Sequence, residues 1–242
     1  MSLSQQKNSP VGTPLKIAVV LNGCGARDGS EIQEAVLTLL GLEQAGAEPV
    51  CFAPDELQTR VVNHLTGQVV SEKRHMLQES ARIARGKIRS LDSLLPEAYD
   101  GIVVPGGSGT SYNLCNFAIV GSDARELRIH SGLERVLKQF YTSQRPIGAI
   151  CIAPILIAKA LSGNGITLTF GSPDHPAAKV ARDLGAKVVT CSSESFVSDA
   201  LNRVVTTPAY MHDAKLSGIW PGIQGLCAEV VRLCRESQTS NS

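Results

Sequence analysis

The stretch RPIGAICIAPILIAKAL, residues 145–161, decides the fold. A short apolar run ends near Ile150, and a second apolar run with helical character follows Pro154. Cys151 lies between the two runs, where one element stops and the next begins. The pattern predicts a buried strand, a tight turn and a helix.

The same alternation of strands and helices continues on both sides of this stretch. A strand at 16–22 precedes a helix for which Ser30 is the expected N-cap and Gly46 the stop. Further expected strands lie within 49–54, 99–107, 165–172, 186–191 and 203–210. A small hairpin is expected at 59–70, and helices at 74–86, 130–146, 174–186 and 213–235. Strands that alternate with helices at this spacing indicate one mostly parallel sheet covered on both faces.

One domain accounts for this organisation, because no internal repeat or low-complexity linker interrupts it. We expect a single α/β domain over residues 15–236. A flexible N-terminal tail (1–14) and a polar C-terminal tail (237–242) are expected to flank it.

Composition excludes several classes of function. The 23 Lys+Arg and 22 Asp+Glu residues nearly balance, which gives no electrostatic footprint for nucleic acid or an anionic membrane surface. No apolar run has the length of a membrane span. The first residues are polar and lack the apolar core of a secretory signal, so a cytoplasmic or mitochondrial protein is expected.

The 7 cysteines are odd in number, and none has the spacing of a zinc site. Most have apolar neighbours and are interpreted as reduced core thiols. We expect no metal and no cofactor.

Two interpretations of Cys151 are open from the residues alone. At a tight strand-to-helix turn, the first amides of the helix would stabilise a thiolate, which favours a nucleophile. The apolar neighbours fit a structural core thiol equally well.

VPGG, residues 104–107, follows another expected strand. Its glycines allow the backbone to turn so that the Gly107 amide, together with the Ile152 amide, forms an oxyanion hole. A simple glycine-rich loop is the competing interpretation, and the segment lacks the lysine of a phosphate-binding loop.

Glu31 and Glu34 lie at the start of the first helix, where they share a side. Acidic residues are common there because they complement the helix dipole. A carboxyl near a thiolate would have a raised pKa and would be able to shuttle protons. None of the 5 histidines adjoins Cys151, and only His175, after a strand end, is a further candidate.

With these residues identified, the chain resembles the ElbB-type branch of the ThiJ/PfpI-like superfamily of class I amidotransferase-like proteins. The branch is associated with glyoxalases and isoprenoid biosynthesis. The resemblance extends over about residues 16–235. The matching segments are LNGCGARDGSEIQEAV, CFAPD, VVNHLTG, ESARIARGKI, VPGG, NLCNFA, PIGAICIAP and VVTTPAYM.

The resemblance implies a flavodoxin-like three-layer α/β sandwich, a homodimer and a nucleophile-elbow cysteine, which is Cys151. It makes Glu34 the carboxyl that contacts the sulfur, with Glu31 beside it. The implied oxyanion-hole residues are Gly106, Gly107 and Ile152, and the implied pocket residues are Asn113, Asn116 and Thr207. Ser108 and Tyr112 replace an aromatic residue and a lysine of the branch, which leaves the substrate preference open.

Three functions follow. The first is a cofactor-free, lyase-type glyoxalase acting on small 2-oxoaldehydes such as methylglyoxal through a Cys151 thiolate. The second is a non-enzymatic redox sensor or stress-related protein that uses the same cysteine. A glutaminase is disfavoured, because the sequence has no H-x-E pair to complete a triad.

Overall fold

The computed structural model describes residues 14–239, so the expected N-terminal tail lies outside the described residues except for Pro14. A 7-stranded sheet forms the centre, in the order β10-β11-β7-β6-β1-β2-β5. All neighbouring strands in it are parallel except the β10–β11 pair. The bounds are β1 Leu15–Val20, β2 Ala47–Ala53, β5 Ile88–Ser90, β6 Gly101–Val104, β7 Ile147–Ile150, β10 Val197–Asp199 and β11 Val204–Thr207.

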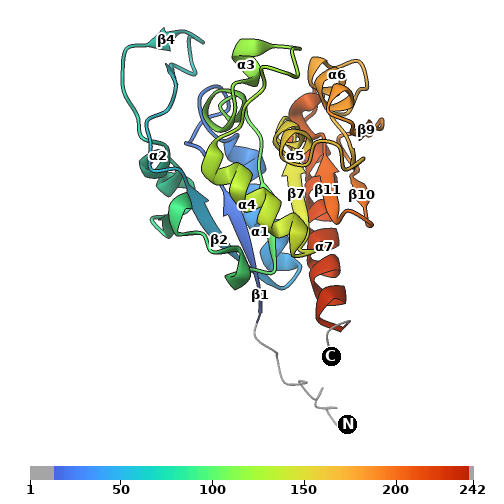
Figure 1. The fold of residues 1–242 in the computed structure, drawn as a ribbon. Helices are drawn as coiled ribbons and strands as arrows, with labels where there is room; N and C mark the ends of the chain where they lie inside the picture. The colour runs from blue at the N-terminus through green and yellow to red at the C-terminus, as the bar shows by residue number, and fades with distance from the viewer. Residues whose placement is uncertain (1–13, 240–242) are drawn as a thin grey trace.

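Helices cover both faces of this sheet, as the alternating sequence pattern predicts (Figure 1). Helices α1 and α7 pack together on one face, and α4 and α5 lie on the other. The bounds are α1 Ile32–Gln44, α2 Met76–Ile83, α3 Phe117–Val120, α4 Ser131–Thr142, α5 Pro154–Ala160, α6 Pro176–Asp183 and α7 Leu216–Thr239. Helix α7 thus extends into the stretch 237–242 that was expected to be a tail.

The central strands read as continuous apolar runs because they are buried on both faces. Every residue of β6, β7 and β11 is buried. The register pairs Val104 with Ala149 and Ile150 with Thr207. The carboxyl ends of these three strands therefore meet at one edge of the sheet, which is where sites form in open parallel sheets.

Several strands differ from the sequence-based expectation. The expected strands at 165–172 and 186–191 contain β8 (Thr167–Leu168) and β9 (Lys187–Val188), which pair with each other in a separate parallel sheet. The short edge strands β5 and β10 were not predicted, because neither has a clear apolar alternation. The expected hairpin is β3 (Val61–Val62) paired with β4 (Val69–Val70).

The start of α1 also differs. Glu31, not Ser30, is the N-cap, since its carboxylate accepts a hydrogen bond from the Glu34 N–H. The Ser30 hydroxyl instead accepts the N–H of Asn22 at 2.9 Å and closes the loop after β1. Helix α1 stops before Gly46, whose φ of +83° is costly for other residues.

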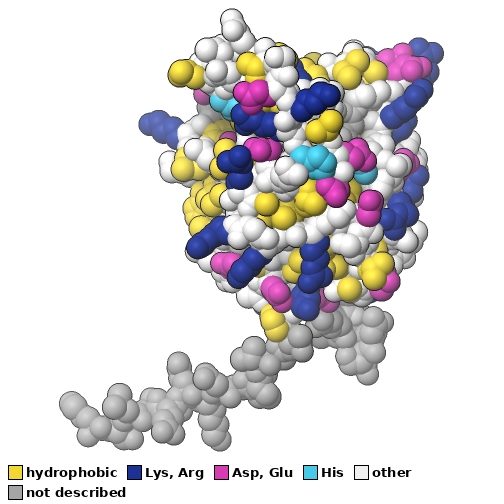
Figure 2. Space-filling model, turned by 90° about the vertical axis from the view of Figure 1, so that its left-hand side faces the viewer, with side chains coloured by type: hydrophobic (Ala, Val, Ile, Leu, Met, Phe, Trp, Pro, Cys, Tyr) yellow, Lys and Arg dark blue, Asp and Glu magenta, His cyan; other side chains and the backbone are white. Residues whose placement is uncertain are grey.

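The face beyond α2 and β5 carries interspersed charges of both signs (Figure 2). Ion pairs among the described residues include Arg74 with Glu72 and His130 with Glu56. Within residues 14–239, no helix is long and apolar enough to cross a membrane, and no group of three or more His, Cys, Asp or Glu residues could hold a metal ion.

Candidate active site at the nucleophile elbow

Cys151 occupies the turn between β7 and α5 with a φ of +61°. Non-glycine residues rarely adopt this left-handed conformation, which costs about 1 kcal/mol or more and is concentrated at functional sites. The turn is held by two backbone bonds: the Cys151 N–H donates to the Thr207 carbonyl at 2.9 Å, and the Ala153 N–H donates to the Ile150 carbonyl at 3.0 Å. The strained turn is therefore fixed by β11 as well as by its own strand.

Gly106 packs directly against this turn. A Cβ atom at this position would lie 2.5 Å from the Cys151 Cβ and 2.8 Å from both the Ile150 carbonyl oxygen and a Glu34 carboxyl oxygen. These approaches are too short for any side chain, so the site requires glycine here. The Gly106 N–H donates to Glu34 Oε2 at 3.0 Å. The Gly106 N–H is therefore used to hold Glu34. The expectation that Gly106 belongs to the oxyanion hole is corrected accordingly.

Gly107 has a φ of +106°, and a Cβ here would lie 2.5 Å from the Glu31 nitrogen. The backbone N–H groups of Gly107 and Ile152 both lower the pKa of Cys151, because they favour an anionic sulfur. Two amides from different strands thus converge on the sulfur. The same pair can stabilise an oxyanion formed next to it.

Glu34 is fully buried beside the sulfur. Its Oε1 accepts the Tyr210 N–H at 3.4 Å while its Oε2 accepts the Gly106 N–H, and its side chain is hydrogen-bonded to Cys151. Burial, followed by repulsion from Glu31, raises the pKa of Glu34 to about 8. At neutral pH this carboxyl therefore holds a proton.

The ionisation of Cys151 differs from the expectation of a thiolate near neutrality. The residue is 8% exposed, and burial raises the pKa of its thiol well above 9.0. The Glu34 carboxylate raises it further, and burial and this carboxylate together outweigh the Gly107 and Ile152 amides. Cys151 and Glu34 cannot both be ionised at low cost, so the pair titrates as a unit.

Glu31 is the more exposed of the two carboxyls. Its N–H donates to the Gly106 carbonyl at 2.9 Å, and its Oε2 accepts the Glu34 N–H at 2.6 Å. Burial raises the pKa of Glu31 against the opposing effect of the amides at the start of α1. The residue thus joins the helix terminus to the glycine turn.

Tyr210 is a site residue that the sequence reasoning missed. It lies in η4 (Ala209–Met211), follows Ala209 with a φ of +41°, and gives its N–H to Glu34. Its hydroxyl donates to the Gln33 side-chain oxygen. Burial, followed by the Glu31 and Glu34 carboxylates, raises the pKa of its phenol. Its place just beyond a strand end was the one available signal.

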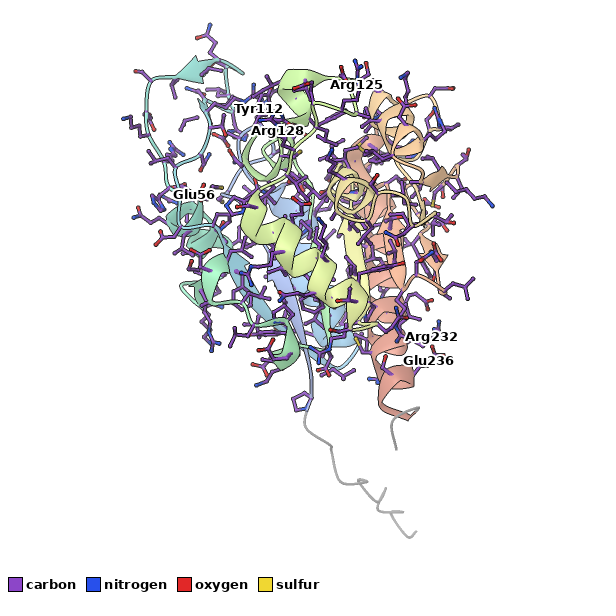
Figure 3. All side chains as sticks on the ribbon, in the orientation of Figure 1. Glu56, Tyr112, Arg125, Arg128, Arg232 and Glu236 are labelled. Carbon is purple, nitrogen blue, oxygen red and sulfur yellow. The ribbon has the colours of Figure 1, made fainter. Side chains whose placement is uncertain are left out.

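The three expected pocket residues have other partners. Asn113 donates to the carbonyls of Asn22 and Asp28 at 3.0 and 2.9 Å. Asn116 joins the Glu126 carbonyl and the Arg128 N–H, within the loops near the Arg128 label in Figure 3. Thr207 contributes its carbonyl to the elbow, but its hydroxyl donates to the Ser195 carbonyl at 2.7 Å. We therefore assign all three to support of the loops and the elbow.

The two residues that depart from the branch pattern also have partners other than Cys151. The Tyr112 ring, labelled in Figure 3, lies 3.6 Å from the Arg60 guanidinium carbon. Ser108 is exposed, and its N–H donates to the Ala26 carbonyl. Neither residue is among the groups that shift the pKa of Cys151.

The five histidines, all within the described residues, have partners other than Cys151. His175 caps α6 through its ring nitrogen and stacks on Phe170 with ring centroids 6.2 Å apart. The contacts of the others are His64 with Val62, His75 with Asp55, His130 with Glu56, and His212 with Cys191. No Cys–His–Glu triad is formed in residues 14–239.

A family model covers the segments that form this site. The DJ-1/PfpI family model matches residues 25–213, a span that includes Glu34, both glycines and Cys151. The chain belongs to the DJ-1/PfpI family. The resemblance inferred from the sequence motifs, and the flavodoxin-like fold that it implies, are thereby confirmed.

Two similar proteins match most of the chain. The mitochondrial ES1 protein homolog of Rattus norvegicus is 41% identical over 226 residues, which are 90% of this chain and 84% of the relative. The mitochondrial glutamine amidotransferase-like class 1 domain-containing protein 3 of Homo sapiens is also 41% identical, over 90% of this chain and 83% of the relative.

A solved structure also superposes closely on this chain. It is an isoprenoid biosynthesis protein with an amidotransferase-like domain from Ehrlichia chaffeensis. The TM-score is 0.82 at 35% sequence identity, covering 90% of this chain and 99% of that chain.

Proposed function

We propose that the protein is a cofactor-independent, glyoxalase-type enzyme that converts small 2-oxoaldehydes to 2-hydroxy acids through Cys151. The observation that carries the proposal is the contact between the Cys151 thiol and a buried, protonated Glu34, with the Gly107 and Ile152 amides on the same sulfur. Such a set supplies a nucleophile, a proton carrier and an oxyanion site.

The reaction starts when the Cys151 sulfur attacks the aldehyde carbon. Loss of one proton from the pair leaves the Glu34 carboxylate beside the Cys151 thiol, because the pKa of Glu34 is about 8 and that of Cys151 is well above 9.0. As the C–S bond forms, the carboxylate takes the thiol proton and passes it to the aldehyde oxygen. The product is a hemithioacetal, and Glu34 is again a carboxylate. Until the proton arrives, the Gly107 and Ile152 amides stabilise the developing negative charge on oxygen.

The Glu34 carboxylate then removes the hydrogen from the former aldehyde carbon and returns a proton to the neighbouring carbon through an enediol. The result is a thioester of a 2-hydroxy acid on Cys151. Water hydrolyses the thioester, which releases the acid and restores the thiol. The net change is addition of one water to the 2-oxoaldehyde, and no external oxidant or reductant is needed.

A pKa near 8 suits Glu34 to this double role, because the group gains and loses a proton near neutral pH. The small exposed fraction of Cys151, 8%, favours small substrates. The raised pKa of the thiol predicts slow turnover that increases with pH.

Incubation with methylglyoxal tests the proposal by measuring lactate formation. We expect lactate from the wild type and none from Cys151→Ala. Cys227→Ala is the matched control, because Cys227 is buried at the α1–α7 contact with its thiol on the Thr38 carbonyl. Equal lactate formation by wild type and Cys151→Ala would refute the proposed glyoxalase activity of Cys151.

Redox sensing remains the second candidate. The same amides that favour an anionic sulfur would stabilise a sulfenate or sulfinate on Cys151. Mass spectrometry after mild peroxide treatment distinguishes the two functions: oxidation confined to Cys151 without lactate formation would favour the sensor. A glutaminase has less support, since the described histidines have other partners.

Location and assembly are also proposals. Both curated relatives are named as mitochondrial proteins, and we propose a mitochondrial location for this chain, with the cytoplasm as the alternative. Import of the full chain into isolated mitochondria tests it. The homodimer implied by the family resemblance stays a prediction, which light scattering at several protein concentrations would check.

A further inference from the structure

A cavity lies at the edge of the sheet opposite the elbow. The chain enters β1 at the bottom of Figure 1, whereas α5 follows β7 at the upper end of that strand. Near the amino ends of β1, β2 and β5, a cavity of about 360 Å³ opens between β2 and the segment that leads into β5. Cavities of this size hold small organic ligands in other proteins.

The cavity exists because β2 is longer than its outer neighbour. Strand β2 spans Ala47–Ala53, but β5 pairs only with residues 51–53. The Phe52 carbonyl accepts the Leu21 N–H on the β1 side, so the backbone groups of Pro49 point to the opposite, open edge. Proline has no N–H to offer to an added strand, which protects such an edge from pairing. The open edge therefore suits a small molecule better than an extended peptide.

The charged groups around this cavity are mostly cationic. Lys16, Lys87 and Arg89 line it, and Glu48 is the acidic residue among the described lining residues. The ion pairs found within residues 14–239 use other lysines and arginines. Three positive charges against one negative charge leave two, which is close to the charge of a phosphate monoester at neutral pH, about −2.

Tyr99 adds a buried neutral donor to the cavity wall. The residue is 6% exposed, and its ring packs edge-on against Phe52 with the ring centroids 5.3 Å apart. Its phenol oxygen accepts the Arg89 Nη1–H at 3.4 Å. No acceptor among the described residues takes the Tyr99 hydroxyl proton, although buried hydroxyls normally donate as well as accept. This O–H is therefore available to an oxygen of a ligand.

We propose that this cavity binds a small phosphate monoester. The three cations and the Tyr99 hydroxyl hold the phosphate oxygens, and Pro49, Val50 and Ile88 form an apolar wall against the organic group. A carboxylate carries one negative charge and leaves one positive charge of the lining unmatched, so the phosphate is favoured. The site is distinct from the elbow and does not depend on the glyoxalase proposal.

NMR titration of the full chain tests the site. Phenyl phosphate, inorganic phosphate and phenol are added in separate experiments, and the amide signals of residues 86–88 are followed. We expect phenyl phosphate to shift these signals saturably with a Kd of about 1 mM or lower. Inorganic phosphate lacks the apolar group and should bind roughly tenfold more weakly. Phenol should not saturate the signals, and added salt should weaken the binding of phenyl phosphate.

Two variants locate the binding. Lys87→Gln removes one cation and should weaken phenyl phosphate binding about fivefold, and Tyr99→Phe removes only the hydroxyl and should weaken it about tenfold. The matched controls lie elsewhere: Lys138→Gln removes an exposed cation of α4, and Tyr141→Phe removes a hydroxyl that donates to Asn202. Both controls should bind phenyl phosphate like the wild type.

Signals that do not saturate with phenyl phosphate would overturn the site, as would wild-type affinity in both Lys87→Gln and Tyr99→Phe. Equal affinity for phenol and phenyl phosphate would overturn recognition of the phosphate, and inorganic phosphate binding as tightly as the ester would overturn the apolar wall. Lys87→Gln should leave lactate formation and Cys151 alkylation unchanged, because the cavity and the elbow lie at opposite edges of the sheet. Failure of either proposal is thus recognised separately.

Discussion

Cys151 and Cys227 are two buried thiols whose surroundings differ. Cys227 lies where α7 packs on α1, is fully buried, and contacts the Thr38 carbonyl at 3.6 Å. Burial alone raises the pKa of its thiol to about 12. Cys151 is almost as buried, but a carboxyl and two backbone amides adjoin its sulfur.

The comparison shows that burial alone does not distinguish a structural thiol from a reactive one. At Cys227 nothing nearby can exchange a proton or bind an anion, so the thiol stays inert. At the elbow, the strained φ of Cys151 and the close approach of Gly106 bring Glu34 to the sulfur. The elbow thus has a carboxyl beside the sulfur that can gain and lose a proton near neutral pH. The α1–α7 contact around Cys227 has no such group.

The titration of Glu34 should produce the largest effect, which is on the pH dependence of the free energy of unfolding. Its pKa rises from 4.5 to about 8 on folding, so between these values the folded state holds a proton that the unfolded state has lost. Stability from this group is complete below pH 4.5 and falls as pH rises to about 8, by on the order of 5 kcal/mol. Urea unfolding at several pH values should show this decline in the wild type.

Glu34→Gln is the reference for that experiment, since its side chain does not titrate. It should lose the decline, although its amide cannot accept both the Gly106 and Tyr210 N–H groups and should impose a constant cost of about 1–3 kcal/mol. Parallel pH profiles for the two proteins would refute the raised pKa.

Gly106→Ala should have the next largest effect. The added methyl would lie 2.5 Å from the Cys151 Cβ, so we expect a loss of about 3 kcal/mol and altered alkylation of Cys151. Gly41→Ala is the corresponding change at the other thiol, 2.9 Å from the Cys227 sulfur, and should destabilise without affecting Cys151. Gly218→Ala, with 3.9 Å of clearance in α7, is the neutral control. Normal reactivity in Gly106→Ala would contradict the packing at the elbow.

The pH dependence of thiol alkylation should distinguish the two cysteines by their response to Glu34. The Glu34 carboxylate raises the pKa of Cys151, so Glu34→Gln should move the Cys151 midpoint downward and leave Cys227 unchanged. The reaction is followed with iodoacetamide and site-resolved mass spectrometry. A Cys151 midpoint that does not move would show that the two groups are uncoupled.

Asn116→Ala should have the smallest effect. The side chain bonds to the Glu126 carbonyl and the Arg128 N–H, and losing these bonds should cost about 1 kcal/mol. Alkylation of Cys151 should be unaltered, because the residue supports a loop away from the sulfur. A changed Cys151 rate would restore Asn116 to the pocket that the family resemblance implied.

The residues that bring the backbone together were predictable from the sequence. The apolar run before Cys151 predicted a buried strand. The glycines at 106 and 107 indicated a close approach of two backbone segments. Alternation of strands and helices predicted the sheet. These features depend on local patterns, which a sequence displays directly.

Features that depend on the packed environment were not predictable. The thiolate expected at Cys151 was wrong because burial and Glu34 together outweigh the amides. The use of the Gly106 N–H by Glu34 and the contribution of Tyr210 depend on contacts distant in sequence. The separation of β8 and β9 from the main sheet likewise reflects tertiary packing rather than strand propensity.

Infrared difference spectroscopy of the carboxyl groups addresses the proton on Glu34 directly. A protonated carboxyl absorbs in a region free of carboxylate bands, so wild type minus Glu34→Gln isolates this group. We predict a protonated signal at pH 7 that disappears with a midpoint of about 8. A Glu34 that is fully ionised by pH 6 would contradict the coupled cysteine–carboxyl pair and the mechanism built on it.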